Sequence, residues 1–258
     1  PASRGCVPGG VSLMTSPSGA NIRILRKRAA KGDAKMQFVL AERLEETSEF
    51  AEAREWMESA ANAGHADAQL ALGSWCGRGA CGIPKDNARA VQWYTRAAEQ
   101  GHAVSQHTLA VCYVTGEGVA QDLSRAVYWH IRAAEQGHAD AQHKLGCLYA
   151  NGKGLAQDFD GAVHWFTKAA EQGHAEAHYN LGCLYANGEG VAQDRSRAVH
   201  WYSRAAAQGL ALAQASLGLF YAHGEGAAQD WDRAVHWYTK AAEQGHADAQ
   251  FNLGVCYA

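Results

Sequence analysis

The stretch AAEQGHA occupies residues 133–139 and recurs without change at residues 169–175. Close copies begin at Ala97, Ala205 and Ala241, so the chain repeats itself with a period of 36 residues. Tryptophans mark the same period, at Trp93, Trp129, Trp165, Trp201 and Trp237. A fixed period of about 20 to 50 residues indicates a repeat array, whose units bury their apolar faces against one another.

The copy at residues 138–173 contains two helix patterns. In the first, over about 139–151, Ala141, Leu145 and Tyr149 form one apolar stripe at i, i+4 and i+8. Gly152 then supplies the left-handed residue that ends the helix. Asp158 is suited to cap the second helix, over about 159–172.

In that second helix Trp165 lies three residues after Ala162 and four residues before Ala169, and it is expected to pack against these alanines. The pattern therefore predicts an all-α fold, a right-handed α/α superhelix of 36-residue helix-turn-helix repeats. Gly146 stands in the middle of the first helix, where glycine costs about 1 kcal/mol against alanine. Equivalent glycines are Gly73, Gly182, Gly218 and Gly254, with Ala110 as the exception, so we expect a neighbouring helix to approach closely there.

The repeat spacing predicts how the chain is divided. Residues 1–20, rich in Gly, Pro and Ser, are expected to form a disordered lead-in or linker. Residues 21–258 form the array, with a degenerate first unit at 21–64 and a partial unit at 246–258. The complete units between them are 65–101, 102–137, 138–173, 174–209 and 210–245, and the first of these has one extra loop residue.

Composition excludes some classes of function. The net charge of −3 gives no overall basic field for nucleic acid or anionic membrane. No apolar run approaches the roughly 18 residues of a transmembrane helix. We therefore expect no nucleic acid partner and no membrane insertion.

The pattern A-x-A-x-x-x-L-G-x-x-Y-x-x-G-x-G, followed by D-x-x-x-A-x-x-W-Y-x-x-A-A, resembles the Sel-1-like repeat (SLR) family, relatives of the tetratricopeptide repeat. The resemblance covers about residue 29 to the end. It implies a curved array that serves as an adaptor or scaffold for other proteins. The residues that carry the resemblance in one copy are Ala175, Ala177, Leu181, Gly182, Tyr185, Gly188, Gly190, Asp194, Ala198, Trp201, Tyr202, Ala205, Ala206 and Gly209.

Histidines and glycines suggest chemistry that the repeat explains more simply. His174 and His178 at i, i+4 are interpreted as a helix-start residue and a solvated imidazole, so no metal site and no cofactor are expected. The Gly-x-Gly pairs lack the strand and third glycine of a dinucleotide fingerprint and are interpreted as helix-ending turns. These pairs are Gly116 and Gly118, Gly152 and Gly154, Gly188 and Gly190, and Gly224 and Gly226.

The seven cysteines mostly replace apolar residues of other copies, which indicates buried free thiols and favours a reducing, cytoplasmic compartment. Cys76 and Cys81 are the one local pair that could form a disulfide. The chain begins with Pro1, so a periplasmic or secreted location stays open. Basic residues also recur on the second helix, but glutamates beside them favour a solvated, charge-mixed face. These are Arg89, Arg125, Arg197 and Arg233, and Arg96, Arg132, Lys168, Arg204 and Lys240.

Comparison of the copies separates scaffold from ligand surface, because two adjacent positions of the first helix vary most. We call the residues at one position of successive copies a column. The first column reads Leu70, His107, His143, Tyr179, Ala215 and Phe251, and the second column reads Ala71, Thr108, Lys144, Asn180, Ser216 and Asn252. First helices usually line the concave side of such arrays, so we expect a peptide to bind there. The expected partner-binding residues are His143, Lys144, Tyr179, Asn180, Ser216, Phe251 and Asn252.

The leading interpretation is a non-catalytic, monomeric scaffold that binds a protein or peptide. Two alternatives stay open at this point. One is a secreted relative that binds or hydrolyses β-lactams, although no Ser-x-x-Lys motif occurs. The other is a regulatory module of a larger protein.

Overall fold

The computed structural model describes residues 22–257, and the expected lead-in at 1–20 lies outside them. Fourteen helices and no strands occur in this range, which confirms the all-α repeat array. The described chain divides into two compact units, one ending at Lys85 and one starting at Asp86. The first unit contains α1 (Ile22–Ala29), α2 (Ala34–Glu46), α3 (Phe50–Asn62) and α4 (Ala66–Arg78).

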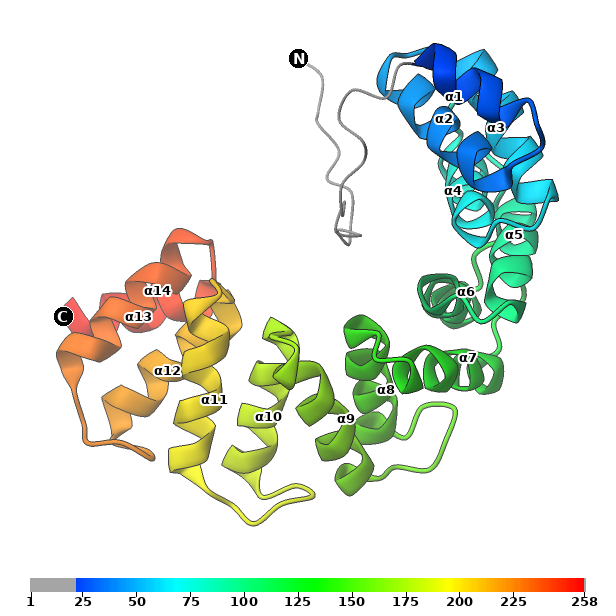
Figure 1. Cartoon of the computed structure of the whole chain (residues 1–258). Coiled ribbons are helices and arrows are strands. Elements are labelled where there is room, and N and C mark those ends of the chain that lie inside the picture. The colour runs from blue at the N-terminus through cyan, green and yellow to red at the C-terminus, as the bar shows by residue number, and fades with distance from the viewer. Residues whose placement is uncertain (1–21, 258) are drawn as a thin grey trace. The chain divides into compact units, whose positions relative to one another are not determined.

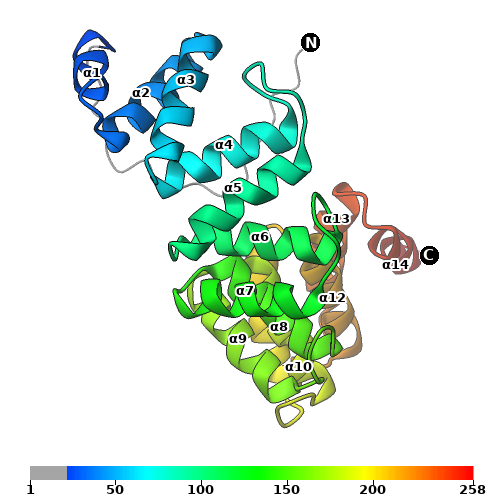
Figure 2. The same cartoon turned by 90° about the vertical axis from the view of Figure 1, so that its right-hand side faces the viewer.

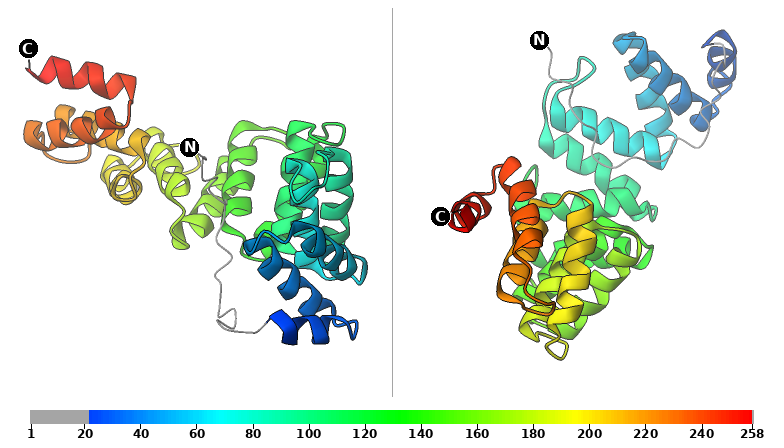
Figure 3. Two further views of the ribbon diagram at one scale, coloured as in Figure 1. Left: turned by 90° about the horizontal axis from the view of Figure 1, so that it is seen from above. Right: turned by 90° about the vertical axis from the view of Figure 1, so that its left-hand side faces the viewer.

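The second unit contains ten helices that follow one another in chain order (Figure 1). The same succession is visible from the side in Figure 2, and by colour from green to red in Figure 3. The helices are α5 (Asn87–Glu99), α6 (Ala103–Thr115), α7 (Leu123–Glu135), α8 (Ala139–Asn151), α9 (Phe159–Glu171), α10 (Ala175–Asn187), α11 (Arg195–Ala207), α12 (Ala211–His223), α13 (Trp231–Glu243) and α14 (Ala247–Tyr257).

Caps define both helices of each repeat. The Asp158 carboxylate accepts from the backbone N–H of Gly161, and its equivalents in the other complete repeats do the same three residues ahead. A histidine precedes the first helix, and its Nδ1 accepts a hydrogen bond from the backbone N–H three residues later, as His174 does from Ala177. Leu210 replaces this histidine in one repeat and makes no such bond. Each first helix of the second unit except α14 ends at a left-handed glycine, such as Gly152 with φ 63°.

The central glycine of the first helix faces an aromatic ring of its own repeat. A Cβ on Gly146 would come within 2.6 Å of the Phe166 ring. Gly182 and Gly218 face Tyr202 and Tyr238 in the same way. Gly254 differs, because a Cβ there would meet nothing within 4 Å.

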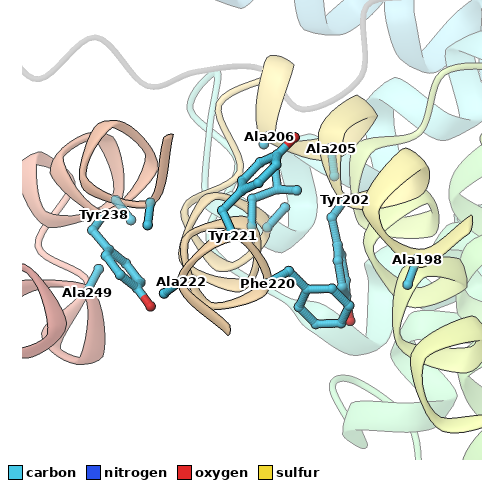
Figure 4. Packing of buried hydrophobic residues seen from close by; sticks show 13 residues of the cluster. Ala198, Tyr202, Ala205, Ala206, Phe220, Tyr221, Ala222, Tyr238 and Ala249 are labelled. Atoms are coloured by element: carbon cyan, nitrogen blue, oxygen red, sulfur yellow. The ribbon is translucent and has the colours of Figure 1, made fainter. Parts of the chain in front are cut away.

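In the three repeats over residues 138–245 these aromatic rings, and not the tryptophans, fill the deepest space between the helices. Phe166, Tyr202 and Tyr238 are buried, whereas Trp165, Trp201 and Trp237, one residue earlier, are half-buried. The tryptophans still lie against the alanine-rich clusters, as Trp237 does beside the cluster around Ala205 and Ala213. Figure 4 shows the Tyr202 ring beside Phe220, with their centroids 5.4 Å apart.

The second glycine of each Gly-x-Gly turn lies against the preceding repeat. A Cβ on Gly226 would come within 2.2 Å of the Arg195 carbonyl oxygen, so only glycine fits without a shift. Gly118, Gly154 and Gly190 approach Asn87, Leu123 and Phe159 in the same manner. The turn is therefore a contact between repeats as well as a helix end.

No helix within residues 22–257 has both the length and the apolar character needed to cross a bilayer.

Candidate functional site

The second column lies on the accessible surface of the first helices. Lys144 is exposed, and Asn180, Ser216 and Asn252 are half-buried. The first column is less uniform, since His143 is buried, Tyr179 is half-buried and Phe251 is 73% exposed. The expected binding residues, which we call the strip, thus lie on α8, α10, α12 and α14 at different depths.

A contact between the columns joins neighbouring repeats. The Asn180 amide nitrogen lies 3.0 Å from Nε2 of His143 in the preceding repeat. The same amide nitrogen lies 3.8 Å from the Cys147 thiol, and that thiol lies 3.5 Å from His143 Nε2. Beneath them the His143 ring stacks on His174 at 4.5 Å. His143 therefore holds Asn180 in place instead of reaching solvent itself.

Tyr179 is placed less deeply than His143. Its ring lies 5.6 Å from the Tyr202 ring, centroid to centroid. Burial raises the pKa of the Tyr179 hydroxyl to about 12, so it is a neutral donor and acceptor at physiological pH.

A cavity of about 340 Å³ opens between repeats 138–173 and 174–209. Its lining comes from α8, α9, α10 and the turn after α10. The lining residues are Cys147, Ala150, Asn151, Phe159, Phe166, Asn180, Cys183, Leu184 and Glu189. Asn180 thus belongs both to the second column and to this cavity.

The Cys147–His143 contact was not anticipated from the sequence, although their i, i+4 spacing was visible there. A nucleophilic cysteine needs a thiolate, which a protonated imidazole stabilises. Here burial raises the pKa of Cys147 and lowers that of His143 to about 3. Both groups are neutral at physiological pH, so the pair lacks the thiolate and the protonated imidazole of a cysteine nucleophile.

His174 and His178 do not act together. His174 caps α10, as expected, and its Nε2 lies 3.2 Å from Asp140. His178 is buried, with Nδ1 3.1 Å from the Gln208 amide and its ring stacked on Trp201, so the prediction of a solvated imidazole was wrong. Within residues 22–257 no group of three or more metal-ligating side chains forms a site.

The cysteines of the described range are all free thiols, Cys76 and Cys81 among them. The Cys81 thiol instead lies 3.8 Å from a Glu45 carboxylate oxygen. Burial raises the pKa of Cys81 to about 11.

The basic columns are engaged within the repeat. Arg197 lies over the Tyr185 ring at 5.5 Å and pairs with Asp194 at 3.4 Å. Arg204 lies over the Trp201 ring at 5.7 Å. These contacts favour packing of the arginine stems over a free basic stripe.

Glutamines that link successive repeats were missed. The Gln142 amide donates to the Ala134 carbonyl of the preceding repeat at 3.0 Å, and Gln172 donates to the Gln142 side chain at 2.8 Å. The recurrence of glutamine at this position, as Gln69, Gln106, Gln142, Gln214 and Gln250, is the signal that could have revealed them.

Comparison with known proteins agrees with the repeat architecture. The Sel1 repeat family matches seven segments, at residues 48–65, 66–102, 103–138, 139–174, 175–210, 211–246 and 247–258. No curated protein sequence matches the chain.

Two solved structures are similar over most of the chain. One is c5321, a protective antigen of uropathogenic Escherichia coli strains with an SLR fold, at 36% identity and a TM-score of 0.88. The match covers 91% of this chain and 51% of that protein, so this chain spans about half its length. The other, a Sel1 repeat protein from Oxalobacter formigenes, has 33% identity and a TM-score of 0.78, over 86% of this chain and 88% of that one.

With seven matched segments and two similar structures of the same repeat, the chain belongs to the Sel1 repeat family, whose TPR-like arrays commonly serve as protein-interaction scaffolds.

Proposed function

We propose that this array is a non-catalytic scaffold that binds a peptide or protein partner through the second column, on the concave face of its first helices. The observation that carries the proposal is a contrast within each first helix. Leu145, Leu181 and Leu217 are fully buried and identical in every copy, whereas the residue before each leucine differs in charge and hydrogen bonding. A position that reaches the surface and differs among otherwise equal units is suited to recognition.

The residues of the strip offer different contacts to a partner. Lys144 contributes a positive charge, and Asn180 and Asn252 contribute amides that suit a peptide backbone. Phe251 adds an exposed aromatic ring. His143 acts beneath the surface, because its bond to Asn180 orients that amide.

The proposal is tested by affinity capture with the complete chain, followed by calorimetry with each captured protein. The Asn180→Ala, Lys144→Ala double variant is compared with a control that changes the exposed Lys168 and Glu171 of α9 to alanine. We expect the double variant to weaken binding about tenfold or more, since hydrogen bonds to charged groups contribute about 1.5–3 kcal/mol. The control should bind as the unaltered chain does. Equal affinity for both variants would exclude this strip.

A further inference from the structure

Each of the four Gly-x-Gly turns lies against the first residue of the preceding second helix, and in two places this contact includes a polar pair. Arg195 Nε lies 3.2 Å from the Glu225 carboxylate. The Asn87 amide donates to the Glu117 carboxylate at 3.0 Å. In both cases the acid stands between the two glycines of a Gly-x-Gly turn. At two of the four Gly-x-Gly turns, the acid of the turn is therefore paired with a donor at the start of the preceding second helix.

One repeat keeps the acid and lacks the donor. Glu189 is equivalent to Glu225, but Phe159 stands where Arg195 would be. The backbone contact is preserved, since a Cβ on Gly190 would come within 2.5 Å of the Phe159 carbonyl carbon. Within residues 22–257 no side chain forms an ion pair or hydrogen bond with the Glu189 carboxylate.

Glu189 and Phe159 both line the 340 Å³ cavity, together with the side-chain amides of Asn151 and Asn180. The Asn151 amide nitrogen donates to the Cys147 carbonyl at 2.7 Å, and the Asn180 amide nitrogen faces His143. Their side-chain oxygens are left as acceptors. The residues that line the cavity thus include one carboxylate, two side-chain amides and the Phe159 ring.

We infer that this cavity takes the guanidinium group of an arginine side chain from the partner, supplying the cation that Arg195 provides internally one repeat later. This inference rests on the proposed function, because Asn180 links the cavity to the second column. A guanidinium offers five donors and no acceptor, and it can bond a carboxylate with two of them. Its planar face also stacks on an aromatic ring such as Phe159. Arginine therefore suits this lining better than lysine, whose ammonium is a compact point charge.

The probe for the experiment is N-acetyl-L-arginine N-methylamide, and its neutral citrulline analogue is the matched ligand control. Binding to the complete chain is followed by NMR, through the side-chain amide signals of Asn151 and Asn180. We expect saturable shifts with the arginine probe, at least about tenfold weaker binding of the citrulline analogue, and the same loss in Glu189→Gln. Glu225→Gln, which removes the equivalent acid of the next repeat, should bind the probe normally.

Phe159→Arg provides a second, independent variant. The introduced guanidinium is expected to pair with Glu189 as Arg195 does with Glu225, so the variant should remain folded and lose probe binding. Thermal unfolding checks the fold of each variant. Equal binding of the citrulline analogue, or unchanged binding by folded Glu189→Gln, would overturn the inference.

The outcomes also separate this inference from the proposed function. A partner that needs Lys144 and Asn180 but is unaffected by Glu189→Gln would leave the scaffold surface standing and refute the arginine site. The opposite outcome is that probe binding depends on Glu189 while no partner depends on Lys144. This outcome would support the arginine site and refute the wider strip.

Discussion

Gly182 of α10 lies directly against the ring of Tyr202 in α11, so that a Cβ on the glycine would come within 2.5 Å of two ring carbons. Tyr202 is buried, and its hydroxyl donates to the Cys183 thiol at 3.5 Å, so the ring has little freedom to move away. The glycine thus allows the two helices of the repeat to approach, although it lowers the intrinsic helix propensity of α10.

Gly182→Ala is expected to destabilise the array by about 1–2 kcal/mol. Overpacking costs about 1–3 kcal/mol, and better helix propensity offsets up to about 1 kcal/mol of it. The free energy of unfolding from urea denaturation measures the difference. Gly254→Ala is the matched control, because nothing lies within 4 Å of its Cβ position, and it should be neutral or stabilising.

The one exception in the glycine column supports the same steric reason. Ala110 stands at the equivalent position, and the residue opposite is His130 instead of tyrosine or phenylalanine. An imidazole is smaller than a phenol ring, so the additional methyl group and the smaller ring occur together. A Gly182→Ala, Tyr202→His variant should therefore show less than the sum of the two single losses.

Asp194→Ala is expected to cost about 1 kcal/mol, because the carboxylate accepts from the Arg197 backbone N–H at 2.9 Å at the start of α11. Asp194→Asn retains an acceptor oxygen and should lose only a part of that free energy. Thermal unfolding of the two variants provides the comparison. Similar losses for both would mean that the charge, which also pairs with the Arg197 side chain, matters more than the cap.

The helix bounds and caps within one repeat could be predicted from the sequence, whereas the side-chain contacts, above all those between repeats, largely could not. The first helix of the 138–173 copy was predicted at 139–151 and is observed there, and the Asp158 cap is confirmed. Periodicity and caps are properties of one segment, so a single copy reveals them. The rotation between neighbouring copies decides which side chains meet across the boundary, and no single copy encodes that angle.

Three observations illustrate this limit. The second glycine of each turn was interpreted only as a helix end, whereas it also touches the preceding repeat. His143 was expected at the partner-binding surface, but it is buried under Asn180 of the next repeat. The cavity beside Glu189 arises because Phe159 and Glu189, 30 residues apart, meet at such a boundary.

Gln142→Leu is expected to destabilise the array by about 1–3 kcal/mol. It removes the bond to the Ala134 carbonyl and leaves the Gln172 amide without its acceptor at Gln142. Gln250→Leu is the matched control, since Gln250 makes the equivalent bond to Ala242 at an exposed place where water can replace it. Urea denaturation of the two variants compares the losses, and an equal loss would contradict the importance of burial.

Buried histidines predict that the array loses stability in mild acid. Burial lowers the pKa of His107 to about 4 and that of His130 to about 3. Their rings lie 5.3 Å apart, with the His138 ring 4.8 Å from His107, and Asp140 and Lys144 are the other charged groups that act on them. In the unfolded chain these imidazoles take up protons near pH 6.5, whereas in the folded chain they remain neutral until about pH 4. The stabilisation of the folded chain by these neutral histidines is therefore fully present above pH 6.5. It is lost as the pH falls toward the folded pKa values, by up to about 1.4 kcal/mol per pH unit for each histidine.

The variant that tests this loss restores the pairing of the other repeats. Ala110→Gly with His130→Tyr recreates the glycine–tyrosine contact seen at Gly182 and Tyr202, and it removes one buried imidazole. We expect the free energy of unfolding of this variant to fall less steeply between pH 6.5 and pH 4 than that of the unaltered chain. The difference in slope should correspond to the uptake of one proton fewer on unfolding. His236→Gln, which removes an exposed imidazole, is the matched control for the loss of one histidine. If the double variant kept the full slope, His130 would not be a source of the acid sensitivity, and the loss would have to come from the remaining buried histidines or from the carboxylates.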